Sequence, residues 1–320
     1  MRGAWRLALA LLVAGAARAS TQERERWIVA SDEAGDRLVV ASTRAPNALT
    51  VIAVGGRPRG MALAPDGRRL FVALGREDAV AVVDVRRWRV IARIPVGRDP
   101  EQVAVRRDGR TLYVSNEEIA MATAVDVATK RRRFRAAVGV EPEGIAVTPD
   151  GGKVYVTGET DSSITVLSAG NGRRLKTFHV GARPRFVLFS RDGRRGFVSA
   201  ENGGSVAIVD VARDSVIASI VIGAGDTRPT GLALSADEGT LYVANGRSNE
   251  VAIVDVASRT VTGTIPTGQR PWGVALSRDG RTLYTADGRS GAIGVLDVVE
   301  RRAGESIPVG GRPYTVLLVP

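Results

Sequence analysis

Short runs of apolar and β-branched residues alternate with turn residues along nearly the whole chain. Residues 54–95 hold four such runs. The same arrangement restarts at Val96, Val138, Val180, Ile222, Thr267 and, for a last partial copy, Val309. The restarts lie 42 residues apart, except that the unit opening at Ile222 has 45. Runs of four to seven residues with Gly and Asp between them are typical of an antiparallel meander rather than of helices.

The turn residues of the repeat have structural explanations. Asp-Gly stands between the first and second runs of most units, and glycine tolerates the positive φ that tight hairpins need. The third run usually ends in Asp, where a carboxylate can accept hydrogen bonds from the backbone of the next turn. We therefore interpret these acids as structural rather than catalytic. They are Asp84, Asp126, Asp210, Asp255 and Asp297.

Four-stranded sheets of this kind must stack, because one sheet cannot bury both of its faces alone, and radial stacking gives a β-propeller. The complete units are 54–95, 96–137, 138–179, 180–221, 222–266 and 267–308. The N-terminal segment offers only three further strands, at 27–31, 37–42 and 49–54. Residues 314–319 supply the fourth. The sequence predicts an all-β, seven-bladed β-propeller of four-stranded antiparallel blades, with one blade built from 27–53 and 309–320.

The first nineteen residues differ from the repeats. Arg2 and Arg6 come just before an apolar stretch over 7–13. Ala17-Arg18-Ala19 supplies a small-x-small cleavage site. This pattern predicts a secretory signal peptide, which is too short to span a bilayer. We expect a periplasmic, monomeric domain over 20–320 without a membrane span. The chain has no Cys, which excludes disulfides, thiolate metal sites and a lipid-bearing cysteine.

The charge balance is strongly basic, with a formal net charge of +11 and only three lysines. The densest basic run is 130–135, KRRRFR, in the turn between the third and fourth runs of its unit. Neighbouring units place 86–89 and 173–176 at the matching turn. A basic rim there could meet an anionic membrane, an acidic protein or nucleic acid. A solvated turn is the simpler interpretation.

Functional residues are expected where the repeat varies most, at the end of the sheets that holds the proline-containing connections between units. The residue after each proline begins the innermost strand, so one such residue per blade should ring the mouth of the central channel. The turns between the second and third runs lie at the same end. The candidate mouth residues are Arg57, Arg59, Glu101, Glu143, Arg183, Arg185, Arg228, Arg270, Trp272, Arg312, Tyr314, Glu117, Glu159 and Glu201.

These residues predict an acidic sector on two or three consecutive blades and an arginine-rich sector, with two aromatic side chains, elsewhere. Guanidinium forks and flat aromatic faces suit a small, planar, anionic ligand. The same mouth would suit a protein partner. The alternative is that these charges only pair with one another across the mouth.

Catalytic and metal-ligating residues are not assigned. His179 has no Cys or second His beside it, which makes a zinc site implausible, and we expect it to be a core or surface filler. No strand–turn–helix nucleophile motif is present. Ca²⁺ held by Glu117, Glu159 and Glu201 on adjacent blades is a weaker alternative.

Three segments, RTLYVSN, KVYVTG and TLYVAN, stand between VGxxPxG-like and VAIVDV-like stretches, and the chain resembles the YVTN-family seven-bladed β-propeller repeat proteins. They occupy 110–116, 153–158 and 240–245. Longer stretches at 99–118, 138–151 and 183–211 resemble the β-propeller subfamily associated with PQQ-dependent catabolism. That resemblance implies a periplasmic accessory protein produced alongside quinoprotein dehydrogenases.

The leading hypothesis is a non-catalytic binding or accessory propeller that requires no cofactor, with PQQ as a ligand it could hold and a quinoprotein dehydrogenase as a partner. The first alternative is a lactonase-like hydrolase on the same fold, in which Glu117, Glu159 or Glu201 near Arg185 would serve as general base. The second is an exported propeller that binds nucleic acid. Few aromatic residues accompany the basic ones, which disfavours this alternative.

Overall fold

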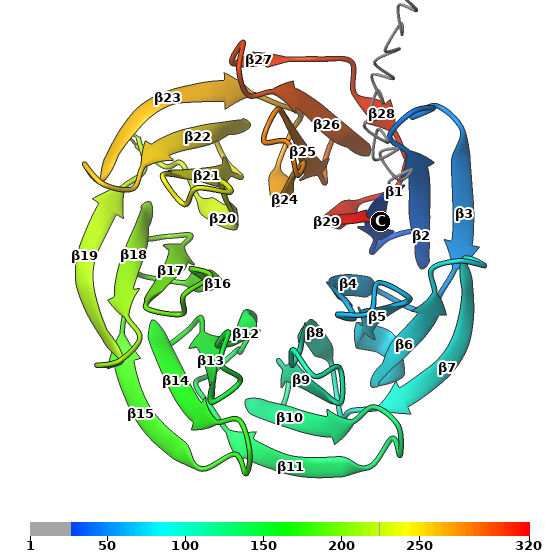
Figure 1. Cartoon of the computed structure of the whole chain (residues 1–320), viewed down its shortest axis with the longest axis vertical. Helices are drawn as coiled ribbons and strands as arrows, with labels where there is room; N and C mark the ends of the chain where they lie inside the picture. Colours follow the sequence, from blue (N-terminus) through cyan, green and yellow to red (C-terminus); the bar gives the residue numbers. More distant parts are fainter. Residues whose placement is uncertain (1–26, 224) are drawn as a thin grey trace, which may run out of the picture.

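The computed structural model describes residues 27–223 and 225–320, which form a ring of seven antiparallel sheets around a central channel (Figure 1). The signal peptide expected over 1–19 lies outside these residues. Blade 1 is ordered β29 (Pro313–Val319), β1 (Trp27–Asp32), β2 (Arg37–Ser42) and β3 (Leu49–Ala53). The first strand of this and every other blade lies innermost (Figure 1).

The other blades follow in chain order. Blade 2 holds β4 (Pro58–Leu63), β5 (Arg69–Leu74), β6 (Ala79–Asp84) and β7 (Arg89–Pro95), with a short 3₁₀ helix at Gly75–Glu77. Blade 3 holds β8 (Pro100–Val105), β9 (Thr111–Asn116), β10 (Met121–Asp126) and β11 (Arg132–Ala137). Blade 4 holds β12 (Ile145–Val147), β13 (Lys153–Gly158), β14 (Ser163–Ser168) and β15 (Arg174–His179).

Blade 5 holds β16 (Pro184–Phe189), β17 (Arg195–Ala200), β18 (Ser205–Asp210) and β19 (Ser215–Val221). Blade 6 holds β20 (Pro229–Leu234), β21 (Thr240–Asn245), β22 (Glu250–Asp255) and β23 (Thr260–Pro266). Blade 7 holds β24 (Pro271–Leu276), β25 (Thr282–Asp287), β26 (Ala292–Asp297), β27 (Arg302–Ala303) and β28 (Ile307–Pro308).

The two ends of the chain share one sheet, as predicted. β29 pairs antiparallel with β1, in a register that sets Trp27 opposite Val319 and Ile28 opposite Leu318. Val316 and Val319 are buried, so the last strand contributes side chains to the core as well as ladder hydrogen bonds. The pairing leaves no open edge between the first and last strands, which would otherwise be a site for aggregation.

The hydrophobic core lies between neighbouring blades. One cluster joins Tyr155, Ile164 and Val166 of blade 4 to Val187 and Val198 of blade 5. The second and third strands of each blade are covered on both faces, so their apolar residues form continuous runs rather than an alternating pattern. This packing explains why the repeat reads as short apolar runs bounded by turn residues.

The fourth strand of blade 7 is divided into two short pieces, whereas the repeat predicts one continuous fourth run near the end of the unit 267–308. β27 and β28 pair with opposite ends of β26, and the backbone between them bends away from the ladder. Gly304 N donates to the Val295 carbonyl across 2.7 Å within this bend. The stretch Gly304-Glu305-Ser306 is exposed and has no apolar side chain to pack on the sheet, so nothing there favours an extended strand.

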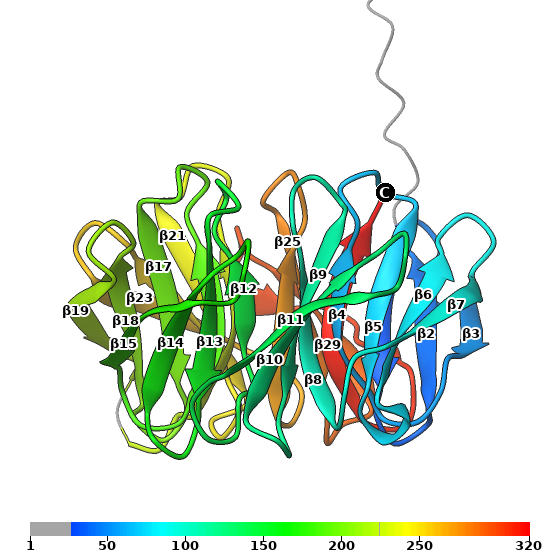
Figure 2. The same ribbon diagram turned by 90° about the horizontal axis from the view of Figure 1, so that it is seen from below.

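The turn chemistry agrees with the sequence interpretation. The Asp126 carboxylate accepts backbone hydrogen bonds from Ala128 at 3.1 Å and from Thr129 at 2.9 Å. Asp84, Asp210, Asp255 and Asp297 accept equivalent bonds in their own blades. These acids therefore hold turns at the end of the ring that carries the C-terminus (Figure 2). His179 is exposed, and its Nδ1 lies 3.2 Å from the Asp161 carbonyl oxygen.

The end of the ring opposite the C-terminus is the channel mouth, where the proline-containing connections and the turns between second and third strands meet. No helix within the described residues has the length and apolar character needed to cross a membrane.

Candidate ligand site at the channel mouth

The connections between blades aim charged residues at the channel axis through an unusual backbone conformation. The residue before the proline has a positive φ in six connections, for example 55° at Arg57 and 58° at Arg270. Few residues other than glycine, asparagine and aspartate adopt this conformation, and the following proline also disfavours the right-handed helical region. The chain therefore turns sharply, and the residue after the proline starts the innermost strand beside the channel.

Hydroxyl groups hold these first residues from the preceding blade. Ser31 Oγ donates to the Arg59 carbonyl at 2.7 Å, and Ser115 Oγ donates to the Glu143 carbonyl at 2.6 Å. Ser199 Oγ makes the equivalent contact between blades 5 and 6. These serines were not singled out in the sequence, although they share one position near the end of the second strand.

Arg185 is the centre of one half of an ion-pair network across the mouth. Its guanidinium lies 2.5 Å from a Glu143 oxygen and 2.5 Å from a Glu201 oxygen, and it also contacts Glu159. The side chain of Arg185 is only 9% exposed. Arg183 approaches Glu159 at 2.8 Å from the rim. Three glutamates of blades 4 and 5 therefore converge on one buried cation.

Arg57 and Arg59 form the other half of the network. Arg59 pairs with Glu101, with Glu33 at 2.9 Å and with Glu143 at 3.5 Å, so it joins the two halves. Arg57 pairs with Asp99 and Glu101, and its guanidinium lies 3.6 Å from Glu117.

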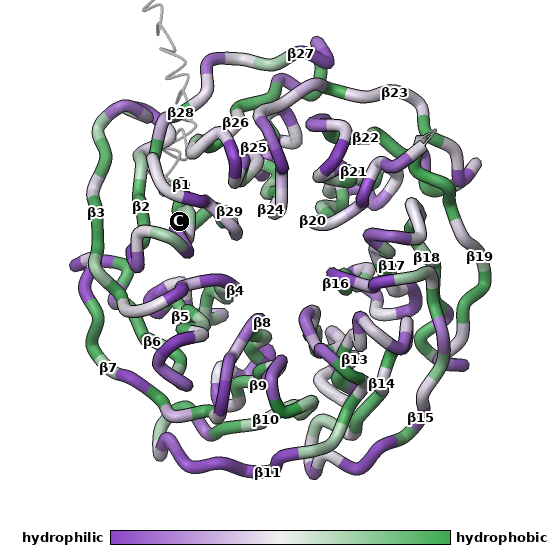
Figure 3. The backbone as a smooth tube through the Cα atoms, turned by 180° about the vertical axis from the view of Figure 1, so that it is seen from behind, coloured by the Kyte–Doolittle hydropathy of each residue, from purple (hydrophilic) through white to green (hydrophobic). Residues whose placement is uncertain are grey.

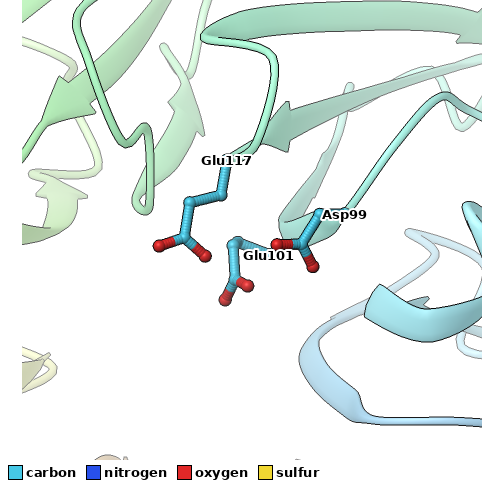
Figure 4. Close-up of side chains that lie close together, drawn as sticks. All are labelled: Asp99, Glu101 and Glu117. Atoms are coloured by element: carbon cyan, nitrogen blue, oxygen red, sulfur yellow. The ribbon is translucent and has the colours of Figure 1, made fainter.

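Three carboxylates converge within blade 3, those of Asp99, Glu101 and Glu117 (Figure 4). They form the only group in the described part of the chain with three acidic, His or Cys ligand atoms close enough to share a metal ion. The Arg57 guanidinium contacts all three, so a cation of the chain itself already neutralises them. The trio of Glu117, Glu159 and Glu201, considered above as a weaker alternative for Ca²⁺, does not form such a group, because Glu159 and Glu201 pair with Arg183 and Arg185 instead.

Burial and pairing push the carboxyl pKa values of the network in opposite directions. Burial favours a raised pKa at Glu143, but Arg185, Arg59 and a hydrogen bond from Tyr314 lower it below its ordinary value. Burial and the nearby Glu143 charge raise the pKa of Glu159 to about 8, despite Arg185 and Arg183. Burial and Glu143 also raise the pKa of Glu101 well above its usual range. At neutral pH, protonation is therefore favoured at Glu159 and Glu101, one in each half of the network, and disfavoured at Glu143.

The channel beside the network holds a cavity of about 140 Å³. Six of its lining residues are the first residues after the proline, and most of the others belong to the inner strands. Small-molecule sites usually span roughly 300–1,000 Å³, so this cavity suits water or a very small ligand.

A larger pocket of about 490 Å³ lies at the mouth between blades 6, 7 and 1. Among the described residues, its charged lining consists of Arg228, Arg247, Arg270, Arg289 and Arg312 and includes no carboxylate. We call it the arginine pocket. Asn249, Gln269 and Trp272 complete the polar and aromatic part of its wall.

The carboxylates that pair with these arginines are not among the described lining residues of the pocket. Arg228 lies 2.9 Å from Asp226, and Arg270 lies 2.7 Å from Glu201. Arg312 is 3.8 Å from Glu33, a long contact. Within the described residues, Arg289 forms no ion pair.

Two aromatic rings connect the arginine pocket to the network. The Arg270 guanidinium lies 4.2 Å from the centroid of the Trp272 ring, a cation–π arrangement. The Trp272 and Tyr314 ring centroids are 5.3 Å apart, and Tyr314 Oη donates to Glu143 at 3.0 Å.

The structure thus divides the predicted mouth residues into two sets. Those in the ion-pair network are Arg57, Arg59, Glu101, Glu117, Glu143, Arg183, Arg185, Glu159 and Glu201. Those lining the arginine pocket are Arg228, Arg270, Trp272 and Arg312, with Tyr314 between the sets. The sequence interpretation missed Arg247 and Arg289. Both stand two places after the end of the second strand in consecutive repeats, a signal that was available.

The fold and this mouth define a seven-bladed β-propeller with an ion-paired channel and a cationic pocket beside it. The family described as lactonase, 7-bladed beta-propeller, matches residues 177–305. No curated protein sequence matches the chain.

Solved structures show the same fold at low sequence identity. Hydrazine synthase of Kuenenia stuttgartiensis is similar with a TM-score of 0.74 and 23% identity, over 81% of this chain and 89% of that one. A functionally unknown protein from Desulfotomaculum acetoxidans gives a TM-score of 0.79 and 15% identity, over 92% and 98%. A protein from Lactobacillus plantarum gives 0.78 and 18%, over 92% and 100%.

Proposed function

We propose that the protein is a non-catalytic, periplasmic binding propeller that holds a small, planar polycarboxylate in the arginine pocket. The observation that supports this most is a pocket of about 490 Å³ whose described lining residues include five arginines and one tryptophan but no carboxylate. Its size falls within the range of small-molecule sites. Guanidinium groups recognise carboxylates through paired hydrogen bonds, and a tryptophan face accepts a flat ring.

PQQ is the ligand that we propose to test first, since it is planar and carries several carboxylates. The resemblance to the PQQ-associated propellers supports the same choice and suggests a quinoprotein dehydrogenase as the partner. The protein would then store or deliver the ligand rather than transform it.

The test is equilibrium dialysis of PQQ against the wild-type protein and two single variants. Arg289→Gln removes a pocket arginine without a carboxylate partner, and we expect its affinity to fall about tenfold or more, the loss of one charged hydrogen bond. Arg194→Gln is the matched control, because that side chain is 86% exposed on the opposite face. Absence of binding to the wild type, or equal losses in both variants, would overturn the proposal.

A lactonase-like hydrolase is the second candidate, favoured by the family match to residues 177–305. That segment includes Arg185 and Glu201, and Glu159 contacts the same guanidinium. A carboxyl group with a pKa near 8 could donate a proton at neutral pH, whereas an ionised glutamate could act as base. Turnover of a sugar lactone that disappears in Glu159→Gln and in Glu201→Gln, but survives in Arg289→Gln, would favour this candidate over the binding function.

A further inference from the structure

One side of the ring carries a concentration of positive charge that neither the mouth nor the fold explains. The outermost strands of blades 2, 3 and 4, with the turns that lead into them, cover 85–95, 127–137 and 169–179. These three segments hold twelve Lys and Arg residues and no Asp or Glu. β7, β11 and β15 are neighbours on the outer wall of the ring (Figure 1). We call this surface the basic wall.

The equivalent segments of the other four blades have a different composition. Residues 43–53, 211–221, 256–266 and 298–308 together hold five arginines and three carboxylates. All seven segments have the same place in the repeat, so the fold does not require cations there. A general bias of the chain toward arginine would raise the number of cations on every blade equally. The concentration on blades 2–4 therefore needs an explanation specific to that side.

Most cations of the basic wall have no carboxylate partner. Five of them are exposed and form no ion pair with any described residue: Lys130, Arg131, Arg132, Arg135 and Arg173. Figure 3 shows a continuous hydrophilic stretch along β11.

Two other cations of the basic wall are held by hydrogen bonds to the neighbouring blade. Arg174 donates to the Ala137 carbonyl at 2.9 Å, and Lys176 donates to the Arg213 carbonyl at 2.8 Å. The first contact links two neighbouring outer strands, and the second links an outer strand to the turn that leads into the next one. Unpaired like charges held side by side repel one another, and an anionic partner would relieve that repulsion.

We propose that the basic wall docks an acidic surface of another protein. Exposed aliphatic side chains stand among the cations, with Ile91 48% and Leu175 37% exposed. Arginines interspersed with apolar residues are the composition that protein interfaces favour. The wall follows the curve of the ring, so a flat bilayer would meet only part of it.

The aromatic residues of the wall argue against nucleic acid as the partner. Trp88 packs edge-on against Trp27, Phe134 packs against Tyr113, and Phe178 packs against Tyr155. None of these three rings is free to stack on a base. Docking on the outer wall would also leave the arginine pocket at the mouth open, so the two proposed sites are independent.

The test measures binding of three fluorescent probes to the full chain at physiological salt: poly-L-glutamate, vesicles with phosphatidylglycerol, and a short DNA duplex. We expect poly-L-glutamate to bind most tightly. The charge-reversed variant Arg131→Glu/Arg132→Glu/Arg135→Glu should weaken this binding at least tenfold. The control Arg191→Glu/Arg194→Glu/Arg278→Glu reverses three exposed arginines outside the wall, and it should change binding by less than about twofold.

Several outcomes would overturn the proposal. They are tighter binding to vesicles or DNA, no binding of poly-L-glutamate, or equal losses in both triple variants. The double variant Arg132→Gln/Arg173→Gln, which removes two charges without reversing them, should weaken binding by about threefold. It tests the proposal even if the charge-reversed variant does not fold. Arg289→Gln should leave this binding unchanged, which separates the basic wall from the arginine pocket.

Discussion

Replacing Arg185 by methionine should destabilise the protein strongly, because it removes the cation on which three buried carboxylates converge. Glu143, Glu159 and Glu201 are 6%, 4% and 1% exposed, so water cannot replace the lost partner. Removing one member of a buried ion pair typically costs about 3–5 kcal/mol, since the other charge stays buried.

The surrounding arginines determine where in that range the loss of stability falls. Without Arg185, Glu143 keeps Arg59 at 3.5 Å, Glu159 keeps Arg183 at 2.8 Å, and Glu201 keeps Arg270 at 2.7 Å. Because each carboxylate retains one cation, we expect the lower end, about 3 kcal/mol at pH 7. Methionine has a similar length to the arginine stem, so little of this loss should come from packing.

The pH dependence distinguishes this explanation from a simple packing defect. In the variant, carboxyls that lack their cation have higher pKa values in the folded than in the unfolded state. The folded state then binds more protons, so lowering the pH favours it. The deficit relative to wild type should therefore shrink between pH 7 and pH 5.

Urea unfolding at these two pH values measures the effect. Arg228→Met is the control, since that side chain is 34% exposed and pairs, among the described residues, with Asp226 alone, and it should lose less than about 1 kcal/mol. A deficit in Arg185→Met that equals the control, or that does not change with pH, would refute the reasoning.

Two further predictions concern the same region. Because the folded-state pKa of Glu159 is about 8, above the unfolded value, its contribution to stability is present below the unfolded pKa and lost as pH rises through 8. Urea unfolding of wild type should show stability falling from pH 7 to pH 9, and Glu159→Gln should flatten that slope; an unchanged slope would contradict the assignment. Gly144→Ala would place a Cβ 2.5 Å from the Arg185 carbonyl oxygen and should cost about 1–3 kcal/mol in a thermal melt. Gly170→Ala, whose Cβ would meet its nearest atom at 4.0 Å, should be near neutral, and equal losses in the two variants would show that close approach is not the cause.

The repeat allowed most of the fold to be predicted because each strand obeys local rules. The predicted strand at 37–42 coincides with β2, and 314–319 differs from β29 only by one added residue. The closure of the ring followed from counting three strands at one end and one at the other. The split of the fourth strand in blade 7 was missed. The prediction relied on the period of the repeat and not on the local sequence Gly304-Glu305-Ser306, which has no apolar side chain to hold a strand.

The candidate site could be predicted only as a ring of positions. Repeat spacing placed the first residue after each proline at the channel, and six of these residues do line the cavity there. Which charges pair depends on how far side chains reach across neighbouring blades, and spacing carries no such information. Arg59 joins Glu33 of blade 1 to Glu101 of blade 3, a contact that needs three-dimensional geometry.

The two alternatives for the mouth, an open charged site and a set of mutually paired charges, prove to describe neighbouring parts of one structure. The charges of the network pair with one another, while the described lining of the arginine pocket presents guanidinium groups and no carboxylate. Arg270 belongs to both parts, since it pairs with Glu201, lies over Trp272 and lines the pocket.

Five neighbouring guanidinium groups would repel one another and move apart if no carboxylate lay close to them. Asp226, Glu201 and Glu33 offset part of that repulsion and fix the orientation of the arginines they contact. An anion that enters the pocket then meets groups already held in place and loses less entropy on binding. The buried glutamates of the channel therefore matter to the proposed site indirectly, by holding its arginines, and substitutions at Glu201 should affect ligand affinity without any contact between Glu201 and the ligand.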